Sequence, residues 1–168
     1  MKNPSNYILY ILIYLFCISC GIYSFNGASI DKKAETISIS YFINSASTKQ
    51  PTLSQVLTEK LKDYFTQQTN LIINEDDGHL NFKGEIIKYE IKPMAIQSNE
   101  TASQNRLTIS VKVKFNNIYN SEYDFSHTFS RYRDYQSSQN LSDIETVLIN
   151  EISNELVDDI FNKSVVNW

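Results

Sequence analysis

Two cysteines near the start of the chain carry the most distinctive chemistry in the sequence. Cys17 and Cys20 are its only cysteines, and they lie at the end of an apolar segment, Ile8–Ile18, that follows Lys2. A basic start, a short apolar segment and small residues before a cut are typical of an export signal. The segment would form roughly 16 Å of helix, about half a bilayer core, so it is too short for a permanent span.

Cys20 itself completes a lipoprotein box, Ile18-Ser19-Cys20. We therefore expect residues 1–19 to be a signal peptide and the Cys20 thiol to carry a diacylglycerol after cleavage. The residue after Cys20 is Gly rather than Asp, and no acidic run follows, which indicates an outer-membrane lipoprotein anchored by lipid on the periplasmic side. The alternatives are an ordinary secretory signal cut elsewhere and an uncleaved anchor.

Few other residues offer a route to catalysis. The chain has no G-x-S-x-G, H-E-x-x-H or S-x-x-K motif. His127 falls on the apolar side of a predicted strand, so we expect a packed, hydrogen-bonded histidine rather than a base. The run Glu75–Asp77 lacks the calcium-loop pattern and is typical of a solvated turn. With both cysteines assigned to the signal, we expect no enzyme, no metal site, no disulfide and no cofactor.

Basic residues are the remaining candidates for function. Lys112 and Lys114 lie two residues apart and share one side of a predicted strand, and Arg106 has the same parity. Neighbouring strands lie about 4.8 Å apart, so lysines and arginines of three strands could form one positive patch. The residues of this predicted patch are Arg106, Lys112 and Lys114, with Lys83, Lys88 and Lys92 before them and Arg131 and Arg133 after them.

A patch of this kind suits a phosphorylated, anionic glycolipid, because charge-assisted hydrogen bonds to phosphate are strong. The alternative is an ordinary solvated sheet face whose lysines prevent edge pairing. The formal net charge of −4 argues against nucleic acid as a partner. The candidate ligand-binding residues are Arg106, Lys112, Lys114, Lys88 and Arg131.

Residue periodicity supplies the elements that position these side chains. Alternation of apolar and polar residues predicts strands at Ile37–Phe42, His79–Pro93, Arg106–Asn116 and Tyr123–Arg131. In the second of these strands Leu80, Phe82 and Ile86 share one face, with Gly84 between them, and the apolar residues from Ile87 to Ile91 have the other parity. A one-residue shift of face beside a glycine predicts a β-bulge.

Helical spacing of apolar residues predicts two helices. The first covers about Thr52–Gln68, and the second runs from a capping box at Ser142–Glu145 to about Ser164. The apolar stripe of the second helix consists of Ile144, Val147, Leu148, Ile152, Leu156, Ile160 and Phe161. The order β-α-β-β-β-α predicts an α+β, two-layer sandwich in residues 20–168, with a mixed sheet of about four strands and two helices on one face.

Several segments, taken in order, resemble a family of outer-membrane lipoproteins. They are Cys20–Ile30 (CGIYSFNGASI), Pro51–Gln55 (PTLSQ), Asn99–Ala102 (NETA), Asn105–Phe115 (NRLTISVKVKF), Phe129–Tyr132 (FSRY), Asp159–Lys163 (DIFNK) and the final Asn167-Trp168. Together with the lipoprotein box, these segments are similar to the LptE family of lipopolysaccharide-assembly lipoproteins. The chain departs from the family pattern at Cys17 and at Arg133–Tyr135.

The resemblance implies a single lipid-anchored periplasmic domain that binds lipopolysaccharide. It also implies a place inside the outer-membrane β-barrel LptD, as plug and assembly partner, with the polar loop Pro93–Arg106 among the contacts. It transfers no ligand-contact motif residue by residue, so the basic candidates depend on charge alone. The alternative function is a free periplasmic lipoprotein that binds another lipid or glycan.

Overall fold

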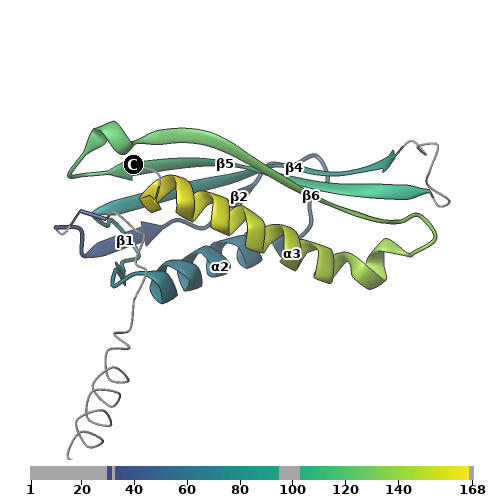
Figure 1. The fold of residues 1–168 in the computed structure, drawn as a ribbon, viewed down its shortest axis with the longest axis horizontal. Coiled ribbons are helices and arrows are strands. Elements are labelled where there is room, and N and C mark those ends of the chain that lie inside the picture. Colours follow the sequence, from purple (N-terminus) through teal and green to yellow (C-terminus); the bar gives the residue numbers. More distant parts are fainter. Residues whose placement is uncertain (1–29, 32, 95–102, 167–168) are drawn as a thin grey trace, which may run out of the picture.

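The computed structural model describes residues 30–31, 33–94 and 103–166 (Figure 1). Cys20, the signal segment and most of the loop Pro93–Arg106 lie outside the described residues. The strands are β1 (Thr36–Ile39), β2 (Ile43–Asn44), β3 (Ile72–Ile73), β4 (Leu80–Met94), β5 (Gln104–Asn117) and β6 (Phe125–Gln136). The helices are α2 (Leu53–Gln68) and α3 (Leu141–Phe161), which continues into a π-helical turn at Asn162–Val166, and a short 3-10 turn lies at Ser121–Tyr123.

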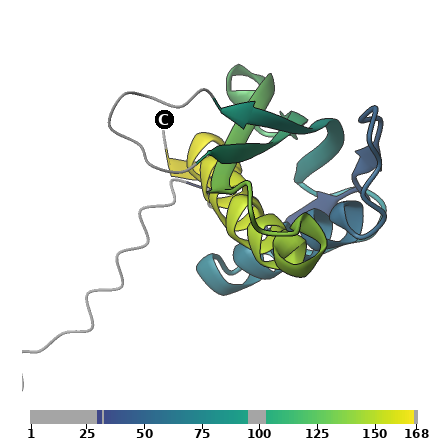
Figure 2. The same ribbon diagram turned by 90° about the vertical axis from the view of Figure 1, so that its right-hand side faces the viewer.

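The strands form one mixed sheet in the order β3-β1-β4-β5-β6. The long strands β4, β5 and β6 are antiparallel, whereas β1 and β2 pair with β4 in parallel, and β3 pairs with β1 in parallel. Both helices lie on the same side of this sheet (Figures 1 and 2). The predicted α+β class with two helices on one face is therefore confirmed, and the short strands β2 and β3 are additions to it.

The alternating residues of β5 form the centre of the core. Leu107, Ile109, Val111 and Val113 have no exposed surface, and Phe115 is almost as buried. Full burial of such side chains contributes about 1.5–3 kcal/mol each before the entropy cost of folding. The buried side of the sheet is therefore set by the strand with the clearest alternation in the sequence.

The helix α3 supplies most of the opposing layer, with two differences from the predicted stripe. Val147 is 57% exposed and lies outside the core, whereas Ile149 and Val157 are buried. The helix begins at Leu141, so the N-cap is Asn140, whose side chain accepts a hydrogen bond from the Ser142 backbone N–H. The predicted capping box at Ser142 is wrong because Asn140, and not Ser142, accepts a hydrogen bond from the free N–H groups of the first turn.

No described helix is long and apolar enough to cross a membrane.

The β-bulge of β4 lies at Ile87, where the register with β5 shifts between Ile86 and Lys88. The predicted change of the apolar side between Ile86 and Ile87 is therefore confirmed, although Gly84 itself lies outside the bulge. Gly84 instead lies under the buried ring of Phe42, and a Cβ atom at this position would overlap the ring carbons. The glycine is needed for packing, because no other residue leaves room for this aromatic ring.

We predict that Gly84→Ala destabilises the fold by about 1–3 kcal/mol, because the new methyl group overpacks the core against Phe42. Urea denaturation of the purified variant measures the free energy of unfolding. In a Phe42→Leu background the same alanine should cost clearly less, because the smaller side chain leaves room for the methyl group. An equal loss in both backgrounds would contradict this account of the glycine.

Candidate functional site

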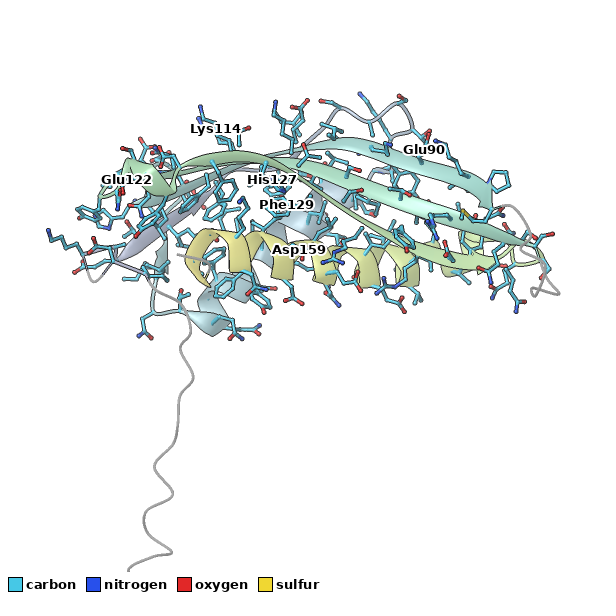
Figure 3. The ribbon with its side chains drawn as sticks, turned by 45° about the horizontal axis from the view of Figure 1, so that its top comes forward. Glu90, Lys114, Glu122, His127, Phe129 and Asp159 are labelled. Carbon is cyan, nitrogen blue, oxygen red and sulfur yellow. The ribbon has the colours of Figure 1, made fainter. Side chains whose placement is uncertain are left out.

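The sheet has one covered face and one face without a helix, which we call the open face. Residues directly opposite each other on antiparallel strands share a face. The open face therefore consists of the even-numbered residues of β5 and the residues opposite them on β4 and β6. Figure 3 shows Lys114 and Glu90 on the upper side of the sheet and Asp159 on α3 below it. The charged residues of the open face are Lys83, Glu85, Lys88, Glu90, Lys92, Arg106, Lys112, Lys114 and Asp134.

The register places four of the five predicted ligand-binding residues on the open face: Arg106, Lys112, Lys114 and Lys88. Arg131 is not among them. It lies opposite Ile109, which is fully buried under the helices, so its side chain lies on the helix side of the sheet. The prediction of one patch that includes Arg131 and Arg133 is therefore wrong, because odd-numbered residues of β6 face the helices.

Several open-face cations already have partners. The Arg106 guanidinium donates from Nε and Nη2 to the two carboxylate oxygens of Asp134 at 2.7 and 2.8 Å, and it lies 3.6 Å from the ring centre of Tyr132. This hydrogen bonding lowers the pKa of Asp134 below its usual value. Lys92 and Lys88 lie 3.0 and 3.8 Å from Glu90. Their charge is therefore partly compensated.

Three exposed lysines toward the end of the open face at which β4 begins and β5 ends form what we call the basic cluster: Lys83, Lys112 and Lys114. Within the part of the chain that the structure describes, none of them has an ion pair. Lys83 and Lys114 lie directly opposite each other on β4 and β5. Like charges in this arrangement destabilise a sheet. Lys112 lies opposite Glu85, so the least compensated positive charge of this face is that of Lys83 and Lys114.

The arginines of β6 have a different environment. Arg131 donates two hydrogen bonds of 2.6 Å to Asp159 on α3. Arg133 donates to Glu151 at 2.8 Å and to Glu155 at 2.6 Å, also on α3. The hydrogen bond from Arg133 lowers the pKa of Glu155 below its usual value. These pairs fasten the outer strand of the sheet to the helix.

Neither histidine has the environment of a catalytic base. His127 is exposed, and its ring meets the edge of Phe129 at a centroid distance of 4.8 Å, so the expectation of a packed, hydrogen-bonded residue is wrong. The outer strand β6 leaves this ring uncovered. The Nδ1 atom of His79 lies 3.0 and 3.2 Å from the backbone nitrogens of Glu35 and Thr36 and accepts from them. This histidine therefore holds the start of β1, a role that the sequence did not suggest.

A polar pocket of about 440 Å³ lies at one end of the open face. Its lining includes two cations, Lys83 and Lys114, and three carboxylates. The remaining polar residues around it carry hydroxyl or amide groups. The pocket is lined by Ser38, Ser40, Asp76, Asp77, Asn81, Phe82, Lys83, Lys114, Asn116 and Asp124. Sequence reasoning missed it, because only the sheet register brings β1, the turn before β4 and the loop before β6 together. In the described residues, no group of three or more His, Cys, Asp or Glu could hold a metal ion.

A comparison with protein-family models finds one match that covers most of the chain. The model for LptE, described as lipopolysaccharide-assembly, matches residues 34–164. A search of curated proteins finds no match.

Solved structures share the fold at low sequence identity. The chain is similar to a protein from Xanthomonas campestris at 12% identity and a TM-score of 0.53, covering 81% of this chain and 91% of that one. It is similar to a hypothetical protein from Chlamydia trachomatis at 8% identity and a TM-score of 0.52, covering 78% and 98%. A minor lipoprotein from Acinetobacter baumannii aligns at 14% identity and a TM-score of 0.47, over 79% and 96%. At these identities, the first two structures support the fold alone.

We predict that the ion pairs of Arg133 make the free energy of unfolding depend on pH in the acid range. The folded-state pKa of Glu155 lies below the usual 4.5, so its stabilisation is present above pH 4.5 and is lost as the pH falls through the lowered value. Arg133→Gln should lower the free energy of unfolding at neutral pH by up to about 1 kcal/mol, since the pair is partly exposed. It should also make the free energy of unfolding fall less steeply as the pH is lowered into the acid range.

Denaturation midpoints measured between neutral pH and about pH 3 test this prediction. The matched control is Lys62→Gln, which removes the exposed pair with Glu59 within α2 and should leave the acid profile unchanged. An Arg133→Gln profile parallel to that of the wild type would refute the link.

Proposed function

The chain belongs to the LptE family of lipopolysaccharide-assembly proteins, and from this premise we propose that it is a non-enzymatic, lipid-anchored subunit that binds lipopolysaccharide at the outer membrane. The proposal is supported by the basic cluster, which presents three lysines without an ion pair in the described residues on a sheet face without helices. Ammonium groups form strong, charge-assisted hydrogen bonds with phosphate. The phosphorylated part of a glycolipid would therefore bind across β4 and β5.

The surface beside the basic cluster suits the rest of such an amphiphile. Ile43 is 66% exposed, and the parallel register of β2 with β4 places it next to Glu85 on the open face. Tyr41, two residues earlier, is 60% exposed. Glu85 lies between Ile43 and Lys112 on this face. Apolar side chains and lysines on one face match a ligand that carries acyl chains and phosphate on one molecule. Lys88 and Arg106 extend the positive surface along the same strands, whereas Arg131 has no part in it.

The membrane anchor in this proposal is a lipid on Cys20. Only a short segment separates Cys20 from Ile30, the first described residue, and β1 begins soon afterwards. The lipid would hold the domain on the periplasmic side of the outer membrane. Three acyl chains give anchoring that is effectively permanent.

The partner in this proposal is a β-barrel of the LptD type, whose lumen would surround much of the domain. Small hydroxyl side chains cover the open side of the outer strand β6, at Ser126, Thr128 and Ser130. The interior of membrane barrels is polar, and a polar exterior of this kind fits it. In this arrangement the domain acts by binding and positioning and performs no reaction.

We predict that Lys112→Glu combined with Lys114→Glu weakens the binding of purified lipopolysaccharide by about tenfold or more, since two charge-assisted contacts are replaced by repulsion. A pull-down with immobilised glycolipid measures the affinity, and circular dichroism checks that the fold is kept. Both side chains are exposed, so the fold should tolerate the change.

The matched control is Lys60→Glu combined with Lys62→Glu on α2, which changes the net charge equally on the opposite layer. This control should bind like the wild type. Unchanged affinity of the open-face variant, or an equal loss in the control, would remove the basic cluster from the proposed site.

A further inference from the structure

The pocket at the end of the open face has one wall that hydrogen bonds hold in place. The turn before β4 carries Asp76 and Asp77. Ser38 Oγ donates to the carbonyl of Asp76 at 3.1 Å, and Asn74 Nδ2 donates to the carbonyl of Asp77 at 2.9 Å. Asn81 accepts from the Gly78 N–H at 3.0 Å and donates to the Gly78 carbonyl at 2.6 Å. These bonds brace the backbone of the turn that carries the two carboxylates.

Packing also braces this turn. A Cβ atom at Gly78 would lie 2.6 Å from the Ser38 backbone nitrogen and 2.7 Å from the Ile37 backbone carbon. Backbone atoms of β1 cannot give way as a flexible side chain could, so only glycine allows the turn to lie this close. The turn is therefore fixed against the strand beside it.

A third carboxylate enters the pocket from the loop before β6. Asp124 accepts from Asn116 Nδ2 at 2.6 Å and from the Asn117 backbone N–H at 2.7 Å. These bonds fix the orientation of the carboxylate and still leave lone pairs for a further donor. The carboxylate of Asp124 is therefore preorganised.

The basic side consists of Lys83 and Lys114. Their Cα atoms face each other across β4 and β5, about 5 Å apart, and like charges at this spacing repel. In the described residues no carboxylate lies within ion-pair distance of either lysine. An anionic group held between the two ammonium groups would relieve this repulsion. Phosphate oxygens, with several acceptor positions, suit that place.

The two sides together restrict the ligand. A ligand with phosphate alone would be attracted by the two lysines but repelled by the three carboxylates. A ligand with an amine alone would be attracted by the carboxylates but repelled by the lysines. A ligand with phosphate and a primary ammonium group a few atoms apart satisfies both sides, and hydroxyl and amide groups around the pocket can bind its ester oxygens. A volume of about 440 Å³ is within the range of small-molecule sites.

We propose that this pocket binds a phosphoethanolamine group, with its phosphate between Lys83 and Lys114 and its ammonium group among Asp76, Asp77 and Asp124. The assignment goes beyond the binding of lipopolysaccharide proposed above. The group could belong to a phospholipid headgroup or to a glycolipid that carries it as a substituent, and the chemistry of recognition is the same.

Calorimetric titration of the full-length protein in a nonionic detergent tests the proposal. The probe is glycerophosphoethanolamine, which carries the headgroup without acyl chains or sugar. It should bind about tenfold more tightly than glycerol 3-phosphate, which lacks the ammonium group. It should also exceed glycerophosphocholine, whose quaternary nitrogen has no N–H to donate. Equal binding of all three probes would overturn the proposal.

Two variants test the two sides of the pocket. Lys83→Gln and Asp77→Asn should each weaken the binding of glycerophosphoethanolamine about tenfold. Asp77→Asn should leave glycerol 3-phosphate no weaker than in the wild type. The matched control is Lys92→Gln, a lysine of the same face and strand as Lys83 that does not line the pocket, and it should bind like the wild type. Full affinity in both pocket variants would overturn the assignment.

The two sources of the group are distinguished with lipids. If the protein prefers vesicles of phosphatidylethanolamine to vesicles of phosphatidylcholine, and Lys83→Gln loses this preference, the natural ligand is the phospholipid. If it prefers lipopolysaccharide with phosphoethanolamine substituents to the unsubstituted form, the natural ligand is the glycolipid. Absence of both preferences contradicts the proposal. Because the soluble probe contains no lipopolysaccharide, a failure of the proposed function leaves the calorimetric result unaffected.

Discussion

The burial of one side of β5 is the constraint on which the rest of this structure depends. Its odd-numbered side chains, from Leu107 to Phe115, lie under α2 and α3 with almost no exposed surface. Strand geometry then places every even-numbered side chain on the opposite face. The antiparallel register extends this division to β4 and β6, so the side on which each basic residue lies follows from the β5 residue opposite it.

The division separates two kinds of basic residue. Arg106, Arg131 and Arg133 bind carboxylates through two nitrogens each, in the forked geometry that guanidinium favours. Arg131 and Arg133 fasten the outer strand to α3. The lysines of the basic cluster have no ion pair in the described part of the chain. We infer that Arg131 and Arg133 serve the fold and that these lysines are available to a ligand.

The sequence predicted the long strands and both helices because their apolar periodicity extends over many residues. It missed β2 and β3, which are too short to show an alternation of apolar and polar residues. The parity of Lys112 and Lys114 was predicted correctly from one strand. Arg131 was misplaced although it shares parity with the buried Phe129, because nearness of strands was given more weight than the side of the sheet. The pocket could not be predicted, since it depends on register and on turn geometry.

In the proposed function, a lipid-anchored domain of the LptE family binds lipopolysaccharide together with an outer-membrane β-barrel. The direct test is affinity purification of the full-length protein from its own membranes, followed by mass spectrometry of the protein and of what purifies with it. We expect a mature chain that begins at an acylated Cys20 and purifies with lipopolysaccharide and a large outer-membrane β-barrel. An unacylated chain that purifies with neither would refute the proposed function.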